Sequence, residues 1–426
     1  MHIHSALKAA ALLLAGMIIL TGAALPAQAQ DTVKIGFTYP ETGPYSVEGL
    51  DERRGAEMAA EEINSGGGIL GKKVELIIRN SQSDKEKGRN NAISFAKDDK
   101  VKMIFGEASS DVSVAVSEVA HENNIIFFGT SASSMDVTGN NGYITTFRGC
   151  ADAWMAARVL GGYLMENYYS KKYFYVYVNY NWGWTTEAAM RYISDTTNAD
   201  IHKRSKLDLK ASDTEIRAAI TEAQFAKPDV LVLILYGEQF VKAIKIANAL
   251  GLTKSNGVQI VAPSITLTMA EAVGPSIMEE VIGTSFWEWN VPKLLDSEQG
   301  IKFVERFARN YKRYPSSLAA SAYTILKEYK SAVERAKTFE TDKVIRALEG
   351  WKYRSLKDDQ EWREFDHQSI QSMFLVKGRP KSEVDLDRFK LDYFKILRKV
   401  DGYEVAIPKP EWIWQRLLNG KSPKLD

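Results

Sequence analysis

Residues Val101–Thr138 read VKMIFGEASSDVSVAVSEVAHENNIIFFGTSASSMDVT, and this stretch decides the fold. Its first apolar run, which stops at Gly106, predicts a buried strand followed by a polar loop. Small apolar residues then recur at helical spacing from Val112 to Ala120. A second apolar run, Ile125 to Phe128, ends in a loop rich in hydroxyl side chains. The order strand, helix, strand is typical of a parallel α/β sheet.

The two polar loops of this stretch are predicted to form half of a small-molecule site. In a parallel α/β sheet, loops at the carboxyl ends of neighbouring strands open into one crevice. Hydroxyls and free backbone N–H groups at a helix N-terminus suit a carboxylate or similar anion. Ordinary helix capping is the alternative, because Ser110 or Asp111 would cap the following helix whatever the function.

Strand and helix patterns alternate through most of the remaining chain. Before the opening stretch we predict strands over 33–38 and 73–79 and helices over 47–64 and 84–97. A second series begins at Asp152, with strands predicted over 173–179, 229–236, 259–262 and 281–286. Two such series predict an α/β protein with two lobes, each built on a parallel sheet with right-handed crossovers.

The last part of the chain has a different pattern. Beyond Ser297 it is mainly helical. The segment Phe389 to Ile407 predicts a strand, a turn at Asp401 and Gly402, and a second short strand.

The N-terminus has the pattern of a secretory signal. An apolar run, Ala9 to Leu20, precedes Ala27-Gln28-Ala29, which is an A-x-A cleavage site, so residues 1–29 are predicted to be a cleaved signal peptide and the location periplasmic. Cleavage would remove one lysine and no acid, leaving 54 basic and 54 acidic residues. A neutral chain gives no reason to expect nucleic-acid binding. Cys150 is the single cysteine, so no intrachain disulfide is possible.

Motifs of enzymes and cofactor sites are missing from the sequence. The mature chain has three histidines, far apart in sequence, and no HExxH or CxxC, so we expect no metal site. The run Gly129 to Ser133 imitates a nucleophile elbow but lacks its closing glycine. There is no G-x-G-x-x-G after the first strand and no P-loop. We therefore expect neither a cofactor nor enzymatic activity.

Several motifs together resemble one known family. They are Val33 to Pro44 with Gly49, the run GAEMAAEEIN at 55–64, GGGILG at 66–71, Phe105-Gly106 and Thr146-Phe147-Arg148. They are similar to the type I periplasmic binding proteins of ABC transporters, in particular the leucine/isoleucine/valine-binding family. The likeness covers about residues 33–380, and the last fifty residues match least.

The resemblance implies two Rossmann-like lobes joined by a three-crossover hinge, with a solute trapped between them. Lobe I would comprise residues 31–148 and 285–365. Lobe II would comprise 149–284 and 366–426, the latter including a C-terminal tail. Cys150 would then lie at the hinge, where a small buried thiol is its simplest role.

The resemblance also implies a set of ligand contacts. Ser109 or Ser110 and then Ser131 and Ser133 would hold a carboxylate, while Trp182 and Tyr236 would contact the solute from the second lobe. From the residues alone, Tyr236 is equally well a strand-end core residue. Trp182 and Trp184 flank Gly183 in a predicted loop, which favours a site over a core.

One departure from the family bears on the ligand. The acid that would hold an α-ammonium follows a proline after the next strand, and here Ser264 follows Pro263. Glu48 or Glu238 could replace it, or the ligand has no ammonium, because an unpaired buried ammonium is costly. In that case Tyr45, Trp182, Trp184 and Tyr236, with Trp287 or Trp289, could line an aromatic slot.

We therefore predict a solute-binding protein, acting as a monomer, that delivers a small carboxylate-bearing aromatic or apolar solute to an ABC permease at the inner membrane. One alternative is a branched-chain or other aliphatic amino acid as the solute, with Glu48 or Glu238 at its ammonium. Another is a periplasmic sensor subunit. Trp287 and Trp289 are expected to pack at the hinge, and His367 to be a structural histidine.

Overall fold

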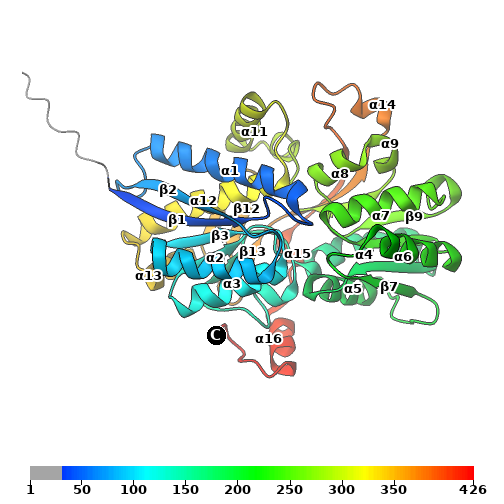
Figure 1. Ribbon diagram of the computed structural model, residues 1–426, viewed down its shortest axis with the longest axis horizontal. Helices are drawn as coiled ribbons and strands as arrows, with labels where there is room; N and C mark the ends of the chain where they lie inside the picture. The colour runs from blue at the N-terminus through cyan, green and yellow to red at the C-terminus, as the bar shows by residue number, and fades with distance from the viewer. Residues whose placement is uncertain (1–30) are drawn as a thin grey trace, which may run out of the picture. The chain divides into compact units, whose positions relative to one another are not determined.

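The predicted alternation of strands and helices forms two α/β lobes in the computed structural model, which describes residues 31–426 (Figure 1). The predicted signal peptide lies outside the described residues. Residues Thr32–Asp426 form one compact unit. The first sheet has the order β2-β1-β3-β4-β5, and all its strands are parallel. Its strands are β1 (Thr32–Tyr39), β2 (Lys73–Asn80), β3 (Met103–Gly106), β4 (Ile126–Gly129) and β5 (Thr146–Arg148).

The register of β3 and β4 brings the two loops of the opening stretch together. Phe105 pairs with Phe128, and Gly106 with Gly129, so both loops leave the sheet at the same level. Helices α1 (Ser46–Ser65), α2 (Lys85–Ser94), α3 (Ser110–Glu122) and α12 (Ser317–Ala336) pack on this sheet. Helix α13 (Thr341–Leu348) packs on α12, and α11 (Glu298–Tyr311) is joined to α1 by the ion pairs of Arg306. Figure 1 shows α1 and α12 on one side of the sheet and α2 and α3 on the other.

Helix α1 approaches α12 closely at Gly55. A Cβ atom at this position would lie 2.1 Å from the carbonyl oxygen of Ala319. The predicted apolar face of α1, which includes Ala56, Ala59 and Ile63, is buried. The glycine and the small side chains after it therefore allow the two helices to pack at short range.

The second sheet has the order β15-β14-β10-β9-β8-β6-β7. The strands β6 to β10 are parallel, and β14 and β15 add two antiparallel strands at one edge. Its strands are β6 (Tyr173–Val178), β7 (Lys203–Leu207), β8 (Val230–Ile234), β9 (Gln259–Ala262), β10 (Ile282–Ser285), β14 (Met373–Gly378) and β15 (Phe394–Val400). Every residue of β8 is buried, because helices cover both faces of the parallel part.

The helices of this second lobe connect its strands or follow them. They are α4 (Ala153–Tyr168), α5 (Asn181–Ile193), α6 (Asp213–Ala226), α7 (Gly237–Ala249), α8 (Leu267–Val273), α9 (Pro275–Met278), α14 (Lys381–Val384) and α15 (Gly402–Val405). Short elements elsewhere are α10 (Val291–Leu294), a π-helical turn over Phe95–Asp99, and 3₁₀ turns over Met135–Val137 and Lys254–Asn256.

The chain passes between the two sheets three times. The first crossover follows β5, the second follows β10, and the third joins β13 (Ser369–Ile370) to β14. A small antiparallel sheet of β11 (Lys352–Arg354), β12 (Asp359–Trp362) and β13 precedes the third crossover. It adjoins the first sheet, since Arg148 and Gln368 form a parallel bridge. The lobe boundaries given above remain a prediction.

Two local predictions were wrong, and one helix was not predicted. Trp182, Gly183 and Trp184 lie in the first turn of α5 and not in a loop, and α5 begins at Asn181. The segment after Asp401 is the short helix α15 and not a strand, because the Asp401 side chain caps it by accepting from the Tyr403 N–H. The tail contains the helix that was not predicted, α16 (Lys409–Leu418). Prolines lie at its N-cap and in its first turn, where a helix tolerates them.

Candidate functional site

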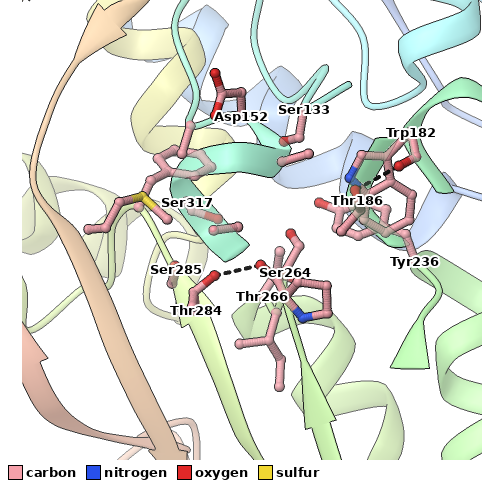
Figure 2. Close-up of a pocket in the computed structure, with 17 residues that line it drawn as sticks. Ser133, Asp152, Trp182, Thr186, Tyr236, Ser264, Thr266, Thr284, Ser285 and Ser317 are labelled. Carbon is pink, nitrogen blue, oxygen red and sulfur yellow. Dashed lines mark hydrogen bonds between the residues drawn. The ribbon is translucent and has the colours of Figure 1, made fainter. Parts of the chain in front are cut away.

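A small cavity of about 20 Å³ lies between the two sheets (Figure 2). In Figure 2, Trp182, Thr186 and Tyr236 lie together on one side, Ser133 and Asp152 on another, and Ser264, Thr266 and Thr284 below. Seven hydroxyl side chains line it besides that of Tyr236, namely Ser133, Thr186, Ser264, Thr266, Thr284, Ser285 and Ser317. Its apolar wall comes from Trp182, Tyr236, Ile265, Phe286, Met373 and alanines of the first crossover and α4.

Four helices of eight or more residues begin at this cavity. Asp152 caps α4, Trp182 lies in the first turn of α5, Tyr236 precedes α7, and Ser317 is the first residue of α12. The amino ends of helices carry partial positive charge. The cavity therefore favours an anionic group although no lysine or arginine side chain lines it.

Four of the eight predicted ligand contacts line this cavity. They are Ser133, Trp182, Tyr236 and Ser264. The other four, Tyr45, Ser109, Ser110 and Ser131, do not line it. All four are nevertheless buried. The site residues remain a prediction, but the structure places half of them around one space.

Tyr45 lies behind Tyr236 in a cluster of aromatic rings. The two rings meet edge to face with centroids 5.2 Å apart, and Trp182 meets Tyr236 at 6.0 Å. The Tyr45 hydroxyl is 2.8 Å from the hydroxyl of Tyr180 on the other lobe. Tyr45 therefore supports the aromatic wall from lobe I and already contacts lobe II.

The remaining predicted serines hold the loops of the opening stretch. The Ser110 hydroxyl accepts a hydrogen bond of 3.1 Å from the Ser134 N–H, so it ties the loop after β3 to the loop after β4. Ser109 precedes α3, and its buried hydroxyl has no hydrogen-bond partner. The Ser131 N–H donates to the Glu107 carbonyl at 3.2 Å.

Two fully buried hydroxyls of the cavity wall have no hydrogen-bond partner. They belong to Tyr236 and Ser317, which lie on opposite lobes. Burial raises the pKa of Tyr236 well above its usual value, and the nearby Glu48 carboxyl adds to this effect. Because buried polar atoms are normally paired, these two are the best-placed donors for a solute.

Asp152 lines the cavity but is already paired. One carboxylate oxygen accepts from Arg148 Nη2 at 3.1 Å and the other from the Met155 N–H at 2.7 Å. Burial raises its pKa, and Arg148 opposes that shift. Asp152 thus orients α4 and the first crossover, and its charge is already paired with Arg148.

Glu48 of lobe I lies next to the cavity and is hydrogen-bonded to lobe II. It is fully buried in α1, and its Oε1 accepts a 2.7 Å hydrogen bond from Thr266, which lines the cavity. Its Oε2 has no partner. Burial raises the pKa of Glu48 to about 7, although the hydroxyls of Thr268 and Thr266 lower it. Glu238, in contrast, is exposed and is not a candidate for a buried ammonium.

Further buried acids orient the hydroxyl loops of the first lobe. Glu107 accepts from Thr38 at 2.7 Å and from Ser81 at 3.0 Å, and Glu52 accepts from Thr130. Burial raises the pKa of Glu107 to about 7. Its φ of +78° is unusual for a side chain with a Cβ and places the start of this loop under strain.

The other aromatic candidates lie elsewhere. Trp184 is 52% exposed, and its indole N–H donates to Asn179. Trp287 is buried against Phe303, and Trp289 stacks on Tyr314 at 3.8 Å, so both pack within the fold as expected. An aromatic slot that includes these three tryptophans is therefore not formed.

The structural role predicted for His367 is confirmed. His367 is buried, stacks on Phe147, and its two ring nitrogens face Thr146 and Glu349 at 3.1 Å each.

Several lining residues were missed by sequence reasoning. Thr266 and Ser285 follow strands of the second sheet, and Asp152 follows β5 of the first. The rule that carboxyl ends of parallel strands carry the site could have found these three. Ser317 and Met373 come from late segments of the chain, and no local pattern places them here.

No metal-binding cluster or membrane span is present in the described part of the chain. Among residues 31–426, no three His, Cys, Asp or Glu side chains are grouped as metal ligands would be. Over the same residues, no helix combines the length and the apolar character that a bilayer crossing needs.

The sequence matches the family model described as periplasmic binding protein over residues 32–383. The chain belongs to the periplasmic binding protein family. Among curated relatives, it is 32% identical over 160 residues to "Leu/Ile/Val-binding protein homolog 1" of Brucella abortus (strain 2308). That match covers 38% of this chain and 43% of the relative, so it spans about two fifths of the relative's length.

Solved periplasmic binding proteins share the whole fold. One from Burkholderia mallei has a TM-score of 0.80 at 24% identity and covers 89% of this chain and 98% of its own. A solute-binding protein of Rhodopseudomonas palustris BisB5 in complex with 3,4-dihydroxybenzoic acid has a TM-score of 0.75 at 17% identity. The match covers 89% of this chain and 100% of that protein. LivJ of Streptococcus pneumoniae in complex with isoleucine has a TM-score of 0.71 at 20% identity, and the match covers 87% of this chain and 100% of LivJ. At these identities the likeness establishes the fold.

Proposed function

We propose that this periplasmic binding protein captures a small carboxylate-bearing solute with an aromatic or apolar body between its two lobes, for delivery to an ABC permease. The carboxylate would lie against the hydroxyls and helix amino ends, and the body against Trp182 and Tyr236. Similar proteins include one solved in complex with 3,4-dihydroxybenzoic acid and relatives named for leucine, isoleucine and valine. We expect the protein to act as a monomer in the periplasm.

One observation carries this proposal. The cavity between the sheets combines hydroxyls from both lobes with an aromatic wall, and no cationic side chain or unpaired carboxylate lines it. A solute that contacts both lobes stabilises their closed arrangement. The amino ends of four helices supply the positive potential that a carboxylate requires.

Thermal unfolding in the presence of small acids tests solute capture. Benzoate, 4-hydroxybenzoate, aliphatic acids and amino acids would each be added, with benzamide as the uncharged control. A solute at 100 times its Kd stabilises the folded state by about 2.7 kcal/mol, so the melting temperature should rise for an acid and not for its amide. If no small acid in the set raises it, the proposal is wrong.

Two tryptophans on one helix provide a matched pair of variants. Trp182→Ala removes part of the cavity wall and should weaken solute binding about 100-fold, in line with the loss of a buried aromatic anchor. Trp184→Ala removes a half-exposed ring outside the cavity and should leave the affinity unchanged. If titration calorimetry shows the same loss of affinity in both variants, the solute does not bind against Trp182.

A second candidate is an amino acid with an aliphatic side chain, favoured by the free oxygen of Glu48 beside the cavity. An ammonium next to this carboxyl would pair with it and supply the counter-ion that Ser264 does not. Glu48→Gln should then abolish binding of leucine and leave benzoate binding nearly unchanged. Glu238→Gln, at an exposed position, is the control and should affect neither ligand.

A sensor subunit would bind the same solute but present it to a different partner. The genes beside the coding sequence distinguish the two roles, because a permease and an ATPase gene accompany transport, and a receptor or kinase gene accompanies sensing.

A further inference from the structure

The three crossovers between the lobes meet at one buried lysine, Lys357. This residue lies in the loop between β11 and β12 and is 2% exposed. Its Nζ donates to the carbonyl oxygen of Phe286 at 2.5 Å, to Gln371 Oε1 at 2.9 Å and to the carbonyl oxygen of Ser372 at 2.9 Å. Phe286 belongs to the second crossover, and Gln371 and Ser372 form the third.

The first crossover is tied to the same lysine through Gln371. The Gln371 side-chain amide accepts from Lys357 and donates from Nε2 to the Gly149 carbonyl at 2.8 Å. The adjacent Asp358 accepts from the Ser372 hydroxyl at 2.6 Å and pairs with Lys399 of β15 at 2.6 Å. One short loop of lobe I therefore contacts the second and third crossovers directly and is linked to the first through Gln371.

The segments held by Lys357 also shape the solute cavity. Phe286 and Met373 line it, and each lies at or next to a carbonyl that accepts from the lysine. A second small cavity adjoins the same segments and is lined by Gly149, Phe286, Lys357 and Gln371 among others.

We propose that Lys357 is a positioning residue for solute capture, which holds the three crossovers in one arrangement so that lobe closure brings Phe286 and Met373 to the solute. The proposal rests on the proposed function for its affinity effect, while its effect on lobe motion is independent of any solute. Without the amine, two carbonyls lose a buried donor, and the crossovers can adopt more than one arrangement.

Single-molecule Förster resonance energy transfer between dyes on the two lobes tests whether Lys357 holds the crossovers in one arrangement. Dyes at Lys97→Cys and Arg217→Cys, two exposed positions on opposite lobes, report the interlobe distance in the solute-free protein. Lys357→Met keeps the length of the side chain and removes its donors. It should broaden the distance distribution. It should also speed dissociation of the solute found by thermal shift about tenfold, as expected for a lost buried hydrogen-bond donor.

Two further variants separate positioning from general stability. Lys327→Met removes a lysine that pairs with Glu62 within lobe I, away from the crossovers, and should leave both readouts unchanged. Lys357→Gln retains a donor and should restore part of the narrow distribution. If Lys357→Met and Lys357→Gln both keep the distance distribution of the unmodified protein, the proposal is overturned, whether or not any solute binds.

Discussion

At the scale of single residues, the site depends on buried groups whose roles are set by their neighbours. Tyr236, Ser317 and Glu48 each keep a polar atom without a partner at or beside the cavity. Gly237, directly after Tyr236, has a φ of +56° and lies against the Pro44 backbone of the other lobe. We expect these residues to determine which solute fits and whether the lobes can close around it.

Gly237→Ala should impair closure. A Cβ at this position would lie 2.5 Å from the Pro44 carbonyl oxygen, so the closed arrangement would be sterically blocked while each lobe could still fold. We expect the affinity for the solute to fall at least tenfold in calorimetry. Gly257→Ala is the control, because Gly257 also has a positive φ of +87° but an added Cβ would meet no atom within 4 Å. An equal loss of affinity in Gly257→Ala would show that the clash with Pro44 is not the cause.

The buried acid Glu288 should make stability dependent on pH. It is 3% exposed, its Oε1 has no partner, and burial raises its pKa to about 8. A carboxyl whose folded pKa is raised stabilises the protein fully below its unfolded pKa, and this contribution is lost as the pH rises through about 8. The unfolding free energy should therefore fall between about pH 5 and pH 8.

Glu288→Gln isolates this contribution. The variant should reduce the fall by about 4 kcal/mol in urea titrations at several pH values, since glutamine does not ionise. Glu298→Gln, at a fully exposed position on α11, is the matched control. An unchanged pH dependence in Glu288→Gln would contradict the assignment.

At the scale of elements, α1 and α16 show how much the surroundings decide. The apolar face of α1 follows from its sequence, but the acids Glu48, Asp51 and Glu52 are also buried. They are buried because α1 lies against strand-end loops of its own lobe and against α7 and α8 of the other. Helix α16 docks through Trp412 and the fully buried Arg416, although nothing in its spacing indicates where it packs.

Arg416 should anchor the C-terminal tail. Its guanidinium donates to the carbonyls of Gly139, Ser422 and Lys424 and to Asp426, and Trp412 donates to Thr138. Arg416→Met should weaken docking by about 2 kcal/mol, because buried carbonyls lose a charged donor. Hydrogen exchange of the amides in 138–144 should then become faster.

Lys424→Met is the control for this prediction, because Lys424 contributes its backbone carbonyl and its side chain is exposed. If Arg416→Met leaves exchange over 138–144 at the rate of the control, the tail is held by other contacts.

At the scale of the whole molecule, solute capture requires two lobes that separate and close. Contacts that join them directly include Thr266 with Glu48, Arg313 with Glu271 at 2.9 Å, and the Glu238 N–H with the Pro44 carbonyl at 3.0 Å. The described structure is therefore a closed arrangement around a small cavity, and opening must break these contacts before a solute can enter.

Cys150 should report this opening. The thiol lies in the first crossover, is fully buried next to Ser133, and burial raises its pKa to about 11. Alkylation by iodoacetamide should be slow, and a bound solute should slow it further because it holds the lobes closed. A rate equal to that of a free thiol, or one insensitive to solute, would contradict this.

Much of this protein follows from its sequence. Apolar runs and helical spacing predicted the strands and helices of both series, because burial of one face depends on local periodicity. The carboxyl-end rule placed Ser133 and the strand-end residues near a common crevice, since parallel strands end at one edge. The family motifs added the two lobes and their three crossovers.

Tertiary structure alone decided the rest. It brought Ser317 and Met373 to the cavity from late segments of the chain, and it joined Lys357 directly to two crossovers and through Gln371 to the third. It also exposed Glu238 and buried Glu48, two acids that the sequence could not distinguish. The physical reason is that periodicity encodes which face of an element is buried, whereas the environment of a single polar side chain depends on which distant segment packs against it.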